Sequence, residues 1–282
     1  MFQLFFNITL NIAALLRVPI SRSRKGFILW NYFLLTTRHF FKSNAKRQIF
    51  MGFELESFSF QTAYFLFSEI FVKNEYFFQT NSKAPIIFDC GSNIGVSVFY
   101  FKWLYPKSII HAFEADPITV ELLKKNIQRN RLENVFVHHV ALSEKDGSVD
   151  FYTDPEHAGS LKMSMLQRGS GCAPVQVPAR TLTSFFKENE LIVDFLKMDI
   201  EGAEQTVVRE AFSSGVLKKV RAATIEFHHH ISDKNAHLAD FLQILEQANF
   251  DYIISARHAP GYRTKLFQDI LLVCRSMDEL DN

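Results

Sequence analysis

The chain has 282 residues, enough for one large α/β domain with an extension or for two small domains. Hydrophobic residues make up 48% of it and charged residues 22%, so a large core can be buried and wholesale disorder is not expected. The formal net charge of +1 argues against the basic surface of a nucleic-acid-binding protein, and we expect no nucleic-acid partner.

The three cysteines, Cys90, Cys172 and Cys274, lie far apart and form neither a CxxC nor a Cys/His spacing. Neither a zinc site nor a disulfide framework is therefore predicted. Cys90 and Cys274 fall in apolar runs, so we expect them to be small buried hydrophobic residues in a reducing compartment. This favours a cytoplasmic location.

The first 83 residues are rich in phenylalanine and are expected to form a helical extension. Their first sixteen residues, MFQLFFNITLNIAALL, carry no formal charge and precede four basic residues, Arg17, Arg22, Arg24 and Lys25. This stretch falls short of the roughly 20 apolar residues that a membrane span requires. Two interpretations stay open: an amphipathic helix that packs on its own domain, or weak contact with a membrane surface through residues 1–25.

Residues 84–276 are expected to form the main domain, because short β-branched runs alternate there with helical patterns. The expected strands cover 85–90, 108–115, 135–140, 193–199, 220–229, 250–256 and 269–275, and the expected helices cover 94–104, 117–130, 201–213 and 236–248. Strands that are apolar on both faces and alternate with helices predict a mostly parallel sheet covered on both sides.

Two stretches break this alternation. Residues 143–180 contain turn signals and short alternating runs, which predict a β-hairpin excursion. The last two strands are joined by a segment that contains Pro260 and Gly261 and leaves no room for a crossover helix, so we expect them to pair antiparallel. Asp116 followed by Pro117 predicts the start of a helix.

A glycine loop, FDCGSNIG at 88–95, follows the first expected strand and precedes the first expected helix. Such a loop lies at the carboxyl end of a sheet, where doubly wound folds bind ligands. It lacks the third glycine of a dinucleotide fingerprint and the Gly-Lys-Ser/Thr ending of a P-loop. Asp89 would repel a pyrophosphate and attract an ammonium or sulfonium group. The loop therefore favours a cationic ligand without phosphate.

The second expected strand ends in FEA and places Glu114 roughly 20 residues after the glycines, where an acid can accept hydrogen bonds from ribose hydroxyls. The third ends near Ala141, where an adenine edge would be met. A ligand with a ribose, a cationic end and no phosphate is S-adenosylmethionine. The alternative is that Gly91 and Gly95 only permit a tight turn and that the two acids only cap strand ends.

The fourth expected strand ends in LKMDIEGAE, which brings three acids, Asp199, Glu201 and Glu204, within six residues. Acids are also favourable in the first turn of a helix, so Glu201 and Glu204 have a structural alternative. Lys197, Asp199 and Glu201 would open onto the same crevice as the glycine loop. A methyl acceptor would have to lie there.

Three consecutive histidines, His228 to His230, follow Glu226 at the end of the fifth expected strand. His228 and His230 would share one face of an extended chain, and together with Asp199 they form a conceivable metal pair. The alternative is polar strand-end residues that turn into solvent. Because the spacing specifies no third ligand, we predict no metal.

The stretches FDCGSNIG, FEADP, RTLTSFF and LKMDIEGAE together resemble the FkbM-type S-adenosylmethionine-dependent methyltransferases, over about residues 85–255. The resemblance implies an α/β, Rossmann-like class I methyltransferase fold with a seven-stranded, mostly parallel sheet whose last strand is antiparallel. It also implies O-methylation of a hydroxyl on a small metabolite, sugar or glycan.

The resemblance also implies which residues serve the site. By position, the cofactor would be held by Asp89, Gly91, Asn93, Gly95 and Glu114, and Asp199, Glu201 and Glu204 would match the family's second acidic motif. We expect Ser92, Ala115 and Ala141 to complete the cofactor site. Three positions depart from the family pattern: Ser92 replaces Ala, Ala115 replaces Pro, and Thr183 replaces Asp, which puts the capping of a local helix in doubt.

Methyl transfer to a hydroxyl needs in-line positioning and a base for the proton. We expect Asp199 to be that base, with His228 as the second choice and Glu201 beside them. Alternatively, Asp199 orients the cofactor's methionine end or the substrate. The acceptor pocket is expected from residues 1–80 and 155–175. A catalytically idle cofactor-binding or membrane-recruited module is the alternative function; an NAD-type oxidoreductase is disfavoured.

Overall fold

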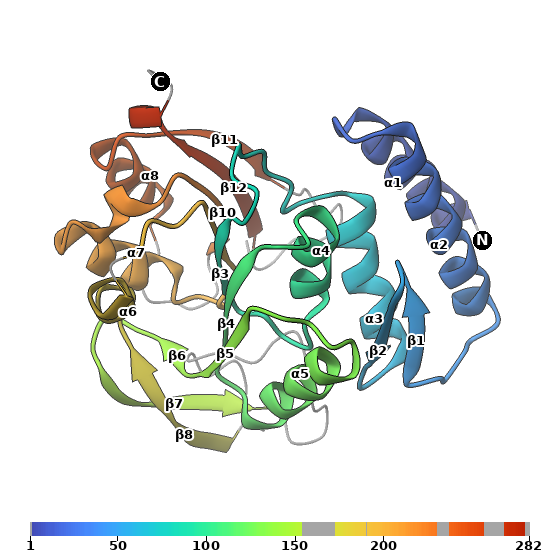
Figure 1. Ribbon diagram of the computed structural model, residues 1–282, viewed down its shortest axis with the longest axis horizontal. Coiled ribbons are helices and arrows are strands. Elements are labelled where there is room, and N and C mark those ends of the chain that lie inside the picture. Colours follow the sequence, from blue (N-terminus) through green and yellow to red (C-terminus); the bar gives the residue numbers. More distant parts are fainter. Residues whose placement is uncertain (1, 154–172, 190, 230–236, 257–267, 280–282) are drawn as a thin grey trace.

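The computed structural model describes residues 2–153, 173–189, 191–229, 237–256 and 268–279. Its centre is a seven-stranded sheet in the order β11-β12-β10-β9-β3-β4-β5 (Figure 1). The strands are β3 (Ile86–Cys90), β4 (Ile109–Glu114), β5 (Val135–His139), β9 (Phe195–Met198), β10 (Ala222–His229), β11 (Phe250–Ala256) and β12 (Gln268–Ser276). Only β12 pairs antiparallel with its neighbours β10 and β11 in this sheet. The predicted fold class and the antiparallel last pair are confirmed.

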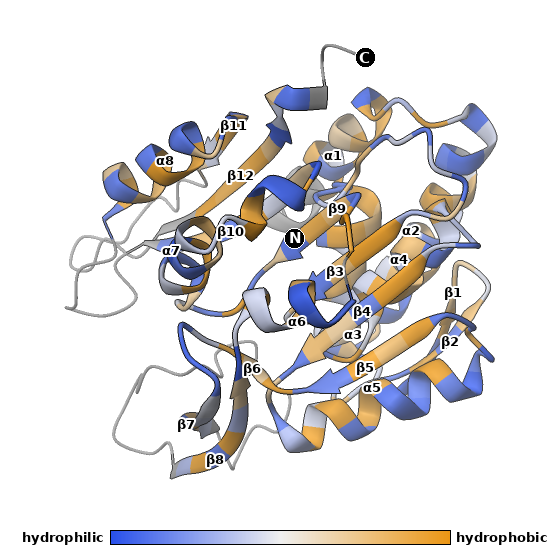
Figure 2. Cartoon of the chain, turned by 60° about the vertical axis from the view of Figure 1, so that its left-hand side comes forward, coloured by the Kyte–Doolittle hydropathy of each residue, from blue (hydrophilic) through white to orange (hydrophobic). Residues whose placement is uncertain are grey.

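Helices cover both faces of this sheet, as the doubly apolar strands predicted. The four predicted helices are α4 (Val96–Leu104), α5 (Pro117–Arg129), α7 (Glu204–Ser213) and α8 (Leu238–Gln247). One buried core contains Ile87 and Ile110 from the sheet, and the other contains Phe88 and Leu196. In Figure 2 the central strands β3 and β4 are hydrophobic, and the amphipathic α5, drawn below them, has both hydrophobic and hydrophilic residues.

The starts of two helices depend on side-chain caps. Asp116 accepts a hydrogen bond from the Thr119 N–H at 2.7 Å, so the predicted start of α5 at Pro117 is confirmed. Helix α6 (Leu182–Asn189) was not among the expected helices. The Thr181 hydroxyl accepts a hydrogen bond from the Ser184 N–H at 3.1 Å, which supplies the cap that Thr183 had put in doubt.

The predicted hairpin excursion is confirmed as a small second sheet. Strands β7 (Gly147–Thr153) and β8 (Ala173–Arg180) pair antiparallel, and the short β6 (Ala141–Leu142) pairs parallel with β8. The connection at 154–172, which contains Cys172 and most of the expected acceptor segment 155–175, lies outside the described residues. Cys90 and Cys274 are buried and free, as predicted.

The N-terminal region is helical, as predicted, with α1 (Phe2–Arg17), α2 (Arg22–Phe40), α3 (Phe60–Phe67) and a π-helical turn η1 (Ser68–Val72). It also contains a hairpin, β1 (Arg47–Phe50) and β2 (Phe53–Glu56), that the sequence did not predict. Its turn uses Met51 and Gly52, both with positive φ, and lacks the Asn-Gly or Asp-Gly signal of such turns.

The phenylalanines of this region join it to the sheet. Phe50, Phe67 and Phe71 are buried and pack against one another, and Phe50 also contacts Phe99 of α4. Helix α4 is therefore buried between the sheet and the N-terminal helices (Figure 1), which explains why its sequence VSVFYFKWL is apolar nearly all round. The predicted boundary at residues 83 and 84 stays a prediction.

Among the helices of the described ranges, none is both long enough and apolar enough to cross a bilayer.

Candidate active site

The glycine loop packs against the end of β9. Gly91 has φ +82°, and a Cβ there would lie 1.8 Å from the Asp199 carbonyl oxygen, so only glycine fits. Gly95 has φ +94°, and a Cβ there would lie 2.8 Å from a methyl group of Leu123. Both glycines are thus required by the turn and its close contacts.

The backbone N–H groups of the loop already have partners. Those of Gly91 and Ser92 both donate to the Phe113 carbonyl oxygen at 3.0 Å, and that of Asn93 donates to the Glu114 carboxylate at 2.9 Å. The Gly95 N–H donates to the Ser92 carbonyl oxygen. A phosphate-binding loop needs such groups free to point at the ligand. This loop is therefore unsuited to a phosphate, as Asp89 had led us to predict.

Asp89 itself is fully buried beneath the loop. It accepts a hydrogen bond from the Ser97 hydroxyl at 2.6 Å and lies 3.6 Å from the Lys197 ammonium. Burial raises the pKa of the Asp89 carboxyl, against the opposing effect of Lys197. Because Asp89 does not line the cavity, the direct attraction for a cationic ligand expected from the sequence is replaced in this geometry by support of the loop.

Lys197 holds the ends of β3 and β9 together. Its ammonium donates to the carbonyl oxygens of Gly91 at 2.5 Å and Cys90 at 3.2 Å, and lies 3.7 Å from the Asp199 carboxylate. Burial lowers the pKa of Lys197, but Asp199 and Asp89 outweigh it and the pKa rises. Lys197 is therefore a buried cation between two acids.

Glu114 ends β4 and is held by two backbone groups. Its two carboxylate oxygens accept hydrogen bonds from the N–H groups of Asn93 and Asp116, both at 2.9 Å. Burial raises the pKa of Glu114 to about 7, and these two hydrogen bonds only partly oppose the rise. Each carboxylate oxygen can accept a further hydrogen bond, so the side chain keeps capacity for a ligand.

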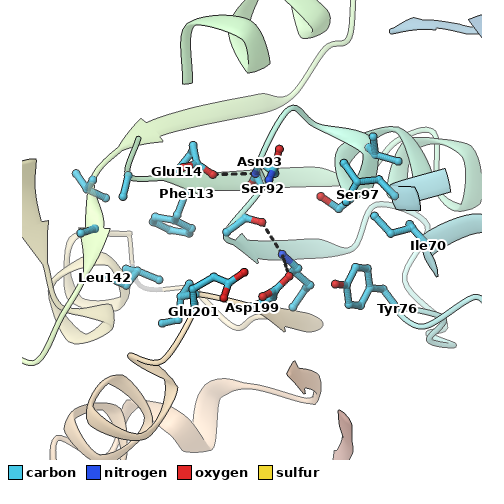
Figure 3. Close-up of a pocket in the computed structure, with 18 of the residues that line it drawn as sticks. Ile70, Tyr76, Ser92, Asn93, Ser97, Phe113, Glu114, Leu142, Asp199 and Glu201 are labelled. Carbon is cyan, nitrogen blue, oxygen red and sulfur yellow. Dashed lines mark hydrogen bonds and ion pairs between the residues drawn. The ribbon is translucent and has the colours of Figure 1, made fainter. Parts of the chain in front are cut away.

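One cavity connects the loop with the acidic turn after β9 (Figure 3). Of the predicted cofactor residues, the cavity is lined by Gly91, Ser92, Asn93, Glu114, Ala115 and Ala141. Of the predicted catalytic residues, it is lined by Asp199 and Glu201. Asp89, Gly95 and His228 lie outside this lining and support residues that belong to it.

The cavity also has apolar walls that the sequence reasoning missed. Phe113 of β4, Leu142 of β6 and Phe151 of β7 line it, and Ile70 and Tyr76 line it from the N-terminal region. Phe113 is the residue before the predicted Glu114, and its place at the strand end was a usable signal. Tyr76 had no such signal, because only tertiary packing brings it to the cavity.

The acidic turn is fixed by Glu204. Its carboxylate accepts hydrogen bonds from the N–H groups of Ile200 at 3.2 Å and Gly202 at 3.0 Å. Glu201 sits in this turn with φ +56° and precedes α7, which begins at Glu204. The first-turn alternative therefore applies to Glu204, while Glu201 faces the cavity.

His228 lies behind the turn and contacts all three acids. Its Nδ1 is 2.8 Å from Glu204, and its Nε2 is 3.3 Å from Glu201 and 3.8 Å from Asp199. Burial lowers the pKa of His228, but Glu204, Glu201 and Asp199 outweigh it and raise the pKa well above its usual value. At neutral pH the ring is therefore a cation that orients the acids, and it has no free nitrogen to accept a proton.

A metal ion could use part of the same cluster. One ligand atom each from Asp199, Glu201 and His228 lie within 4.8 Å of one another. A protonated His228 satisfies the two carboxylates without an ion, in agreement with its raised pKa. The absence of a metal stays a prediction, and the His228–His230 pair falls partly outside the described residues.

The comparison with protein families decides the assignment: the methyltransferase FkbM domain matches residues 89–252. The chain belongs to the FkbM methyltransferase family. This confirms the resemblance seen in the sequence, and the family is one of S-adenosylmethionine-dependent methyltransferases.

Three relatives show how far the FkbM similarity extends. Methyltransferase 1 of Beauveria bassiana is 30% identical over 163 residues, which cover 51% of this chain and 66% of that protein. Methyltransferase sdnD of Sordaria araneosa is 27% identical over 52% of this chain and 68% of that protein. The 31-O-demethyl-FK506 methyltransferase FkbM of Streptomyces tacrolimicus is 32% identical over 33% of this chain and 36% of that protein. The chain thus spans about two thirds or less of these relatives.

Among solved structures, the FkbM methyltransferase of Methylobacillus flagellatus matches 87% of this chain and 58% of its own. The TM-score is 0.47 and the sequence identity is 18%.

Proposed function

We propose that this FkbM methyltransferase transfers a methyl group from S-adenosylmethionine to a hydroxyl oxygen of a small metabolite, sugar or glycan. The observation that carries the proposal is that Asp199 and Glu201 line the same cavity as Glu114 and the glycine loop. One end of this cavity suits a nucleoside, and the other offers carboxylates for a hydroxyl proton.

The loop end fits the nucleoside part of the cofactor. Glu114 would accept hydrogen bonds from the two ribose hydroxyls, which agrees with its remaining acceptor capacity. Phe113, Leu142 and Phe151 would cover the adenine, with the Ala141 backbone at its edge. The loop has no unpaired N–H group from Gly91 to Asn93, as suits a cofactor without phosphate.

When bound, S-adenosylmethionine supplies a methyl group on a sulfonium that is already activated for in-line displacement. The chain must therefore orient the acceptor, exclude water and take up one proton. Asp199 would accept the proton as the acceptor oxygen forms its bond to the methyl carbon and the carbon–sulfur bond breaks. Glu201 would orient the hydroxyl from the neighbouring position.

His228 would act as a positioning residue in this mechanism. Its ring is buried, and its two ring nitrogens face three carboxylates that raise its pKa, so it is a poor base. It would instead hold Asp199 and Glu201 toward the cavity. Asp199 therefore remains the proposed base, and His228, the second choice, receives a positioning role.

The acceptor would lie between the acidic turn and the N-terminal region. Leu66, Ile70 and Tyr76 line that part of the cavity, so part of the acceptor would contact apolar side chains. Among the described residues, this supports the expectation that residues 1–80 contribute to the acceptor pocket. The segment 155–175 stays a prediction.

Calorimetric titration with S-adenosylmethionine, followed by a screen of hydroxylated small molecules for release of S-adenosylhomocysteine, tests the proposal. We expect binding and, with a suitable alcohol, turnover. Absence of binding at millimolar cofactor would contradict the proposal. Binding with methylation of amines or thiols alone would retain the cofactor site and refute the hydroxyl assignment.

A further inference from the structure

The charges of this chain are strongly polarised along the sequence. The first 53 residues contain eight of the 31 Lys and Arg residues and none of the 30 Asp and Glu residues. This segment therefore carries a formal charge of +8, although the whole chain carries +1. The basic residues flank α2 at both ends: Arg17, Arg22, Arg24, Lys25, Arg38, Lys42, Lys46 and Arg47.

Between these basic groups, α2 and the residue after it present a large apolar face to the outside. This outward face is made of Phe27, Trp30, Phe33, Leu34, Phe40 and Phe41. Trp30 is 59% exposed, Phe33 is 61% exposed and Phe41 is 76% exposed. Residues 27, 30, 34 and 41 recur at helical spacing, so they share one side, with 33 and 40 adjacent to them.

The opposite side of α2 anchors the helix to its own domain. Ile28, Tyr32 and Leu35 are buried there. Helix α1 packs on that side too, because the Asn11 amide donates to the Tyr32 hydroxyl at 2.8 Å. The outward face thus stays exposed with α1 in place, and α1 and α2 form the outermost layer of the molecule beside α3 (Figure 1).

We propose that the outward face of α2 docks this enzyme on a bilayer surface that contains anionic lipids. Large exposed apolar faces mark sites of protein or membrane contact. Trp and Phe on one side of a helix, with Lys and Arg around them, are the pattern of a helix that lies in a membrane interface. Because the segment has no acidic residue, its positive charge is complementary to the negative charge of such a surface.

This proposal places membrane contact further along the chain than residues 1–25. It is also independent of the proposed function, because none of the six face residues lines the cavity. Helix α2 is nevertheless connected to the cavity, because its inner side packs against α3 and η1, which contribute Leu66 and Ile70 to the cavity lining.

Flotation of the full chain with phosphatidylcholine vesicles, with and without about 30% phosphatidylserine, tests the docking. We expect strong binding only to the anionic vesicles, together with quenching of Trp30 fluorescence by brominated lipid. The triple variant Trp30→Gln, Phe33→Gln, Phe41→Gln should lose at least about tenfold in partitioning. The variant Arg22→Gln, Lys42→Gln, Lys46→Gln should lose about a hundredfold.

Matched variants control for general changes of the surface. Ile118→Gln, Phe136→Gln, Ile192→Gln removes three apolar groups elsewhere that are each more than half exposed, and Lys107→Gln, Lys145→Gln, Lys218→Gln removes as many charges. Both should bind vesicles like the unmodified chain. Binding of S-adenosylmethionine, measured on every variant, should stay unchanged and separates this test from that of the proposed function.

Three results would overturn the proposal. The first is the absence of anionic vesicle binding by the unmodified chain. The second is an equal loss in the matched control variants. The third is that the outward face binds a second copy of the chain or nucleic acid and not vesicles. This would be seen as self-association or polynucleotide binding that the triple variant of Trp30, Phe33 and Phe41 abolishes.

Discussion

Each end of the cavity has a buried group in it or directly behind it whose pKa is raised, Glu114 at one end and His228 at the other, but for opposite reasons. At the loop end, burial raises the pKa of Glu114 to about 7, and its hydrogen-bond partners are uncharged backbone N–H groups. At the acidic turn, burial lowers the pKa of His228, and three carboxylates more than reverse this. The first end keeps a carboxyl group whose hydrogen-bond partners are uncharged, whereas the second surrounds a buried imidazolium with three carboxylates.

This difference suggests that the Glu114 end governs cofactor binding and that the acidic turn governs turnover. A ligand that donates hydrogen bonds to Glu114 would stabilise its ionised form, so cofactor binding should be coupled to proton release. The carboxylates of Asp199 and Glu201 are already oriented by His228, so they are suited to act on an acceptor. Variants at the two ends should therefore affect different measured quantities.

The largest effect is expected at the acidic turn. Asp199→Asn removes the proposed base while keeping the size of the side chain, and should lower kcat about 100- to 10,000-fold. The dissociation constant for S-adenosylmethionine, measured by calorimetry, should change far less. Asp251→Asn, at an exposed strand position, serves as the matched control. A variant Asp199→Asn with normal kcat would assign the base elsewhere.

A smaller but substantial effect is expected for the residue that links the two ends. Lys197→Met leaves Asp89 buried without its cationic partner, and should lower the free energy of unfolding by about 3–5 kcal/mol. Urea denaturation measures this loss. Adding Asp89→Asn to the same chain should restore part of the stability. If the double variant were as unstable as the sum of the single variants, the Asp89–Lys197 pairing would not be the cause.

The smallest effect concerns the pH dependence of stability. The pKa of His228 is higher in the folded chain than in the unfolded chain, so its stabilising contribution is fully present below about pH 6.5 and is lost as pH rises through the folded value. The difference in unfolding free energy between the unmodified chain and His228→Gln should therefore shrink at alkaline pH. A difference that grows with pH would contradict a protonated His228.

Much of the fold, and the placement of two of the acids at the site, could be predicted from the sequence. Glu114 and Asp199 end parallel strands, and parallel strands bring their carboxyl ends to one edge, so topology alone places both acids at the cavity. The antiparallel last pair followed from the Pro260–Gly261 connection. These predictions depended on patterns that local sequence encodes.

The remainder depends on tertiary contacts that no local pattern encodes. The sequence predicted Asp89 to contact the ligand, but in the structure it is buried beneath the loop and paired with Lys197, which lies 108 residues further along the chain. The partners of His228 come from the turn that follows β9, whereas His228 lies in β10, so its raised pKa could not be inferred from the histidine run. Tyr76 reaches the cavity only because the N-terminal region shares a core with the sheet.

The most direct test of the proposed cofactor site is calorimetric titration with S-adenosylmethionine between about pH 6 and pH 8, on the unmodified chain and on Glu114→Gln. Under the proposal that the ionised form of Glu114 binds the ribose, affinity should rise with pH, by up to about tenfold per pH unit below the pKa, and level off above it. Glu114→Gln should bind about ten- to a hundredfold more weakly at pH 8 and lose this pH dependence. Equal affinity and an equal pH profile in both proteins would contradict the assignment of Glu114 to the ribose.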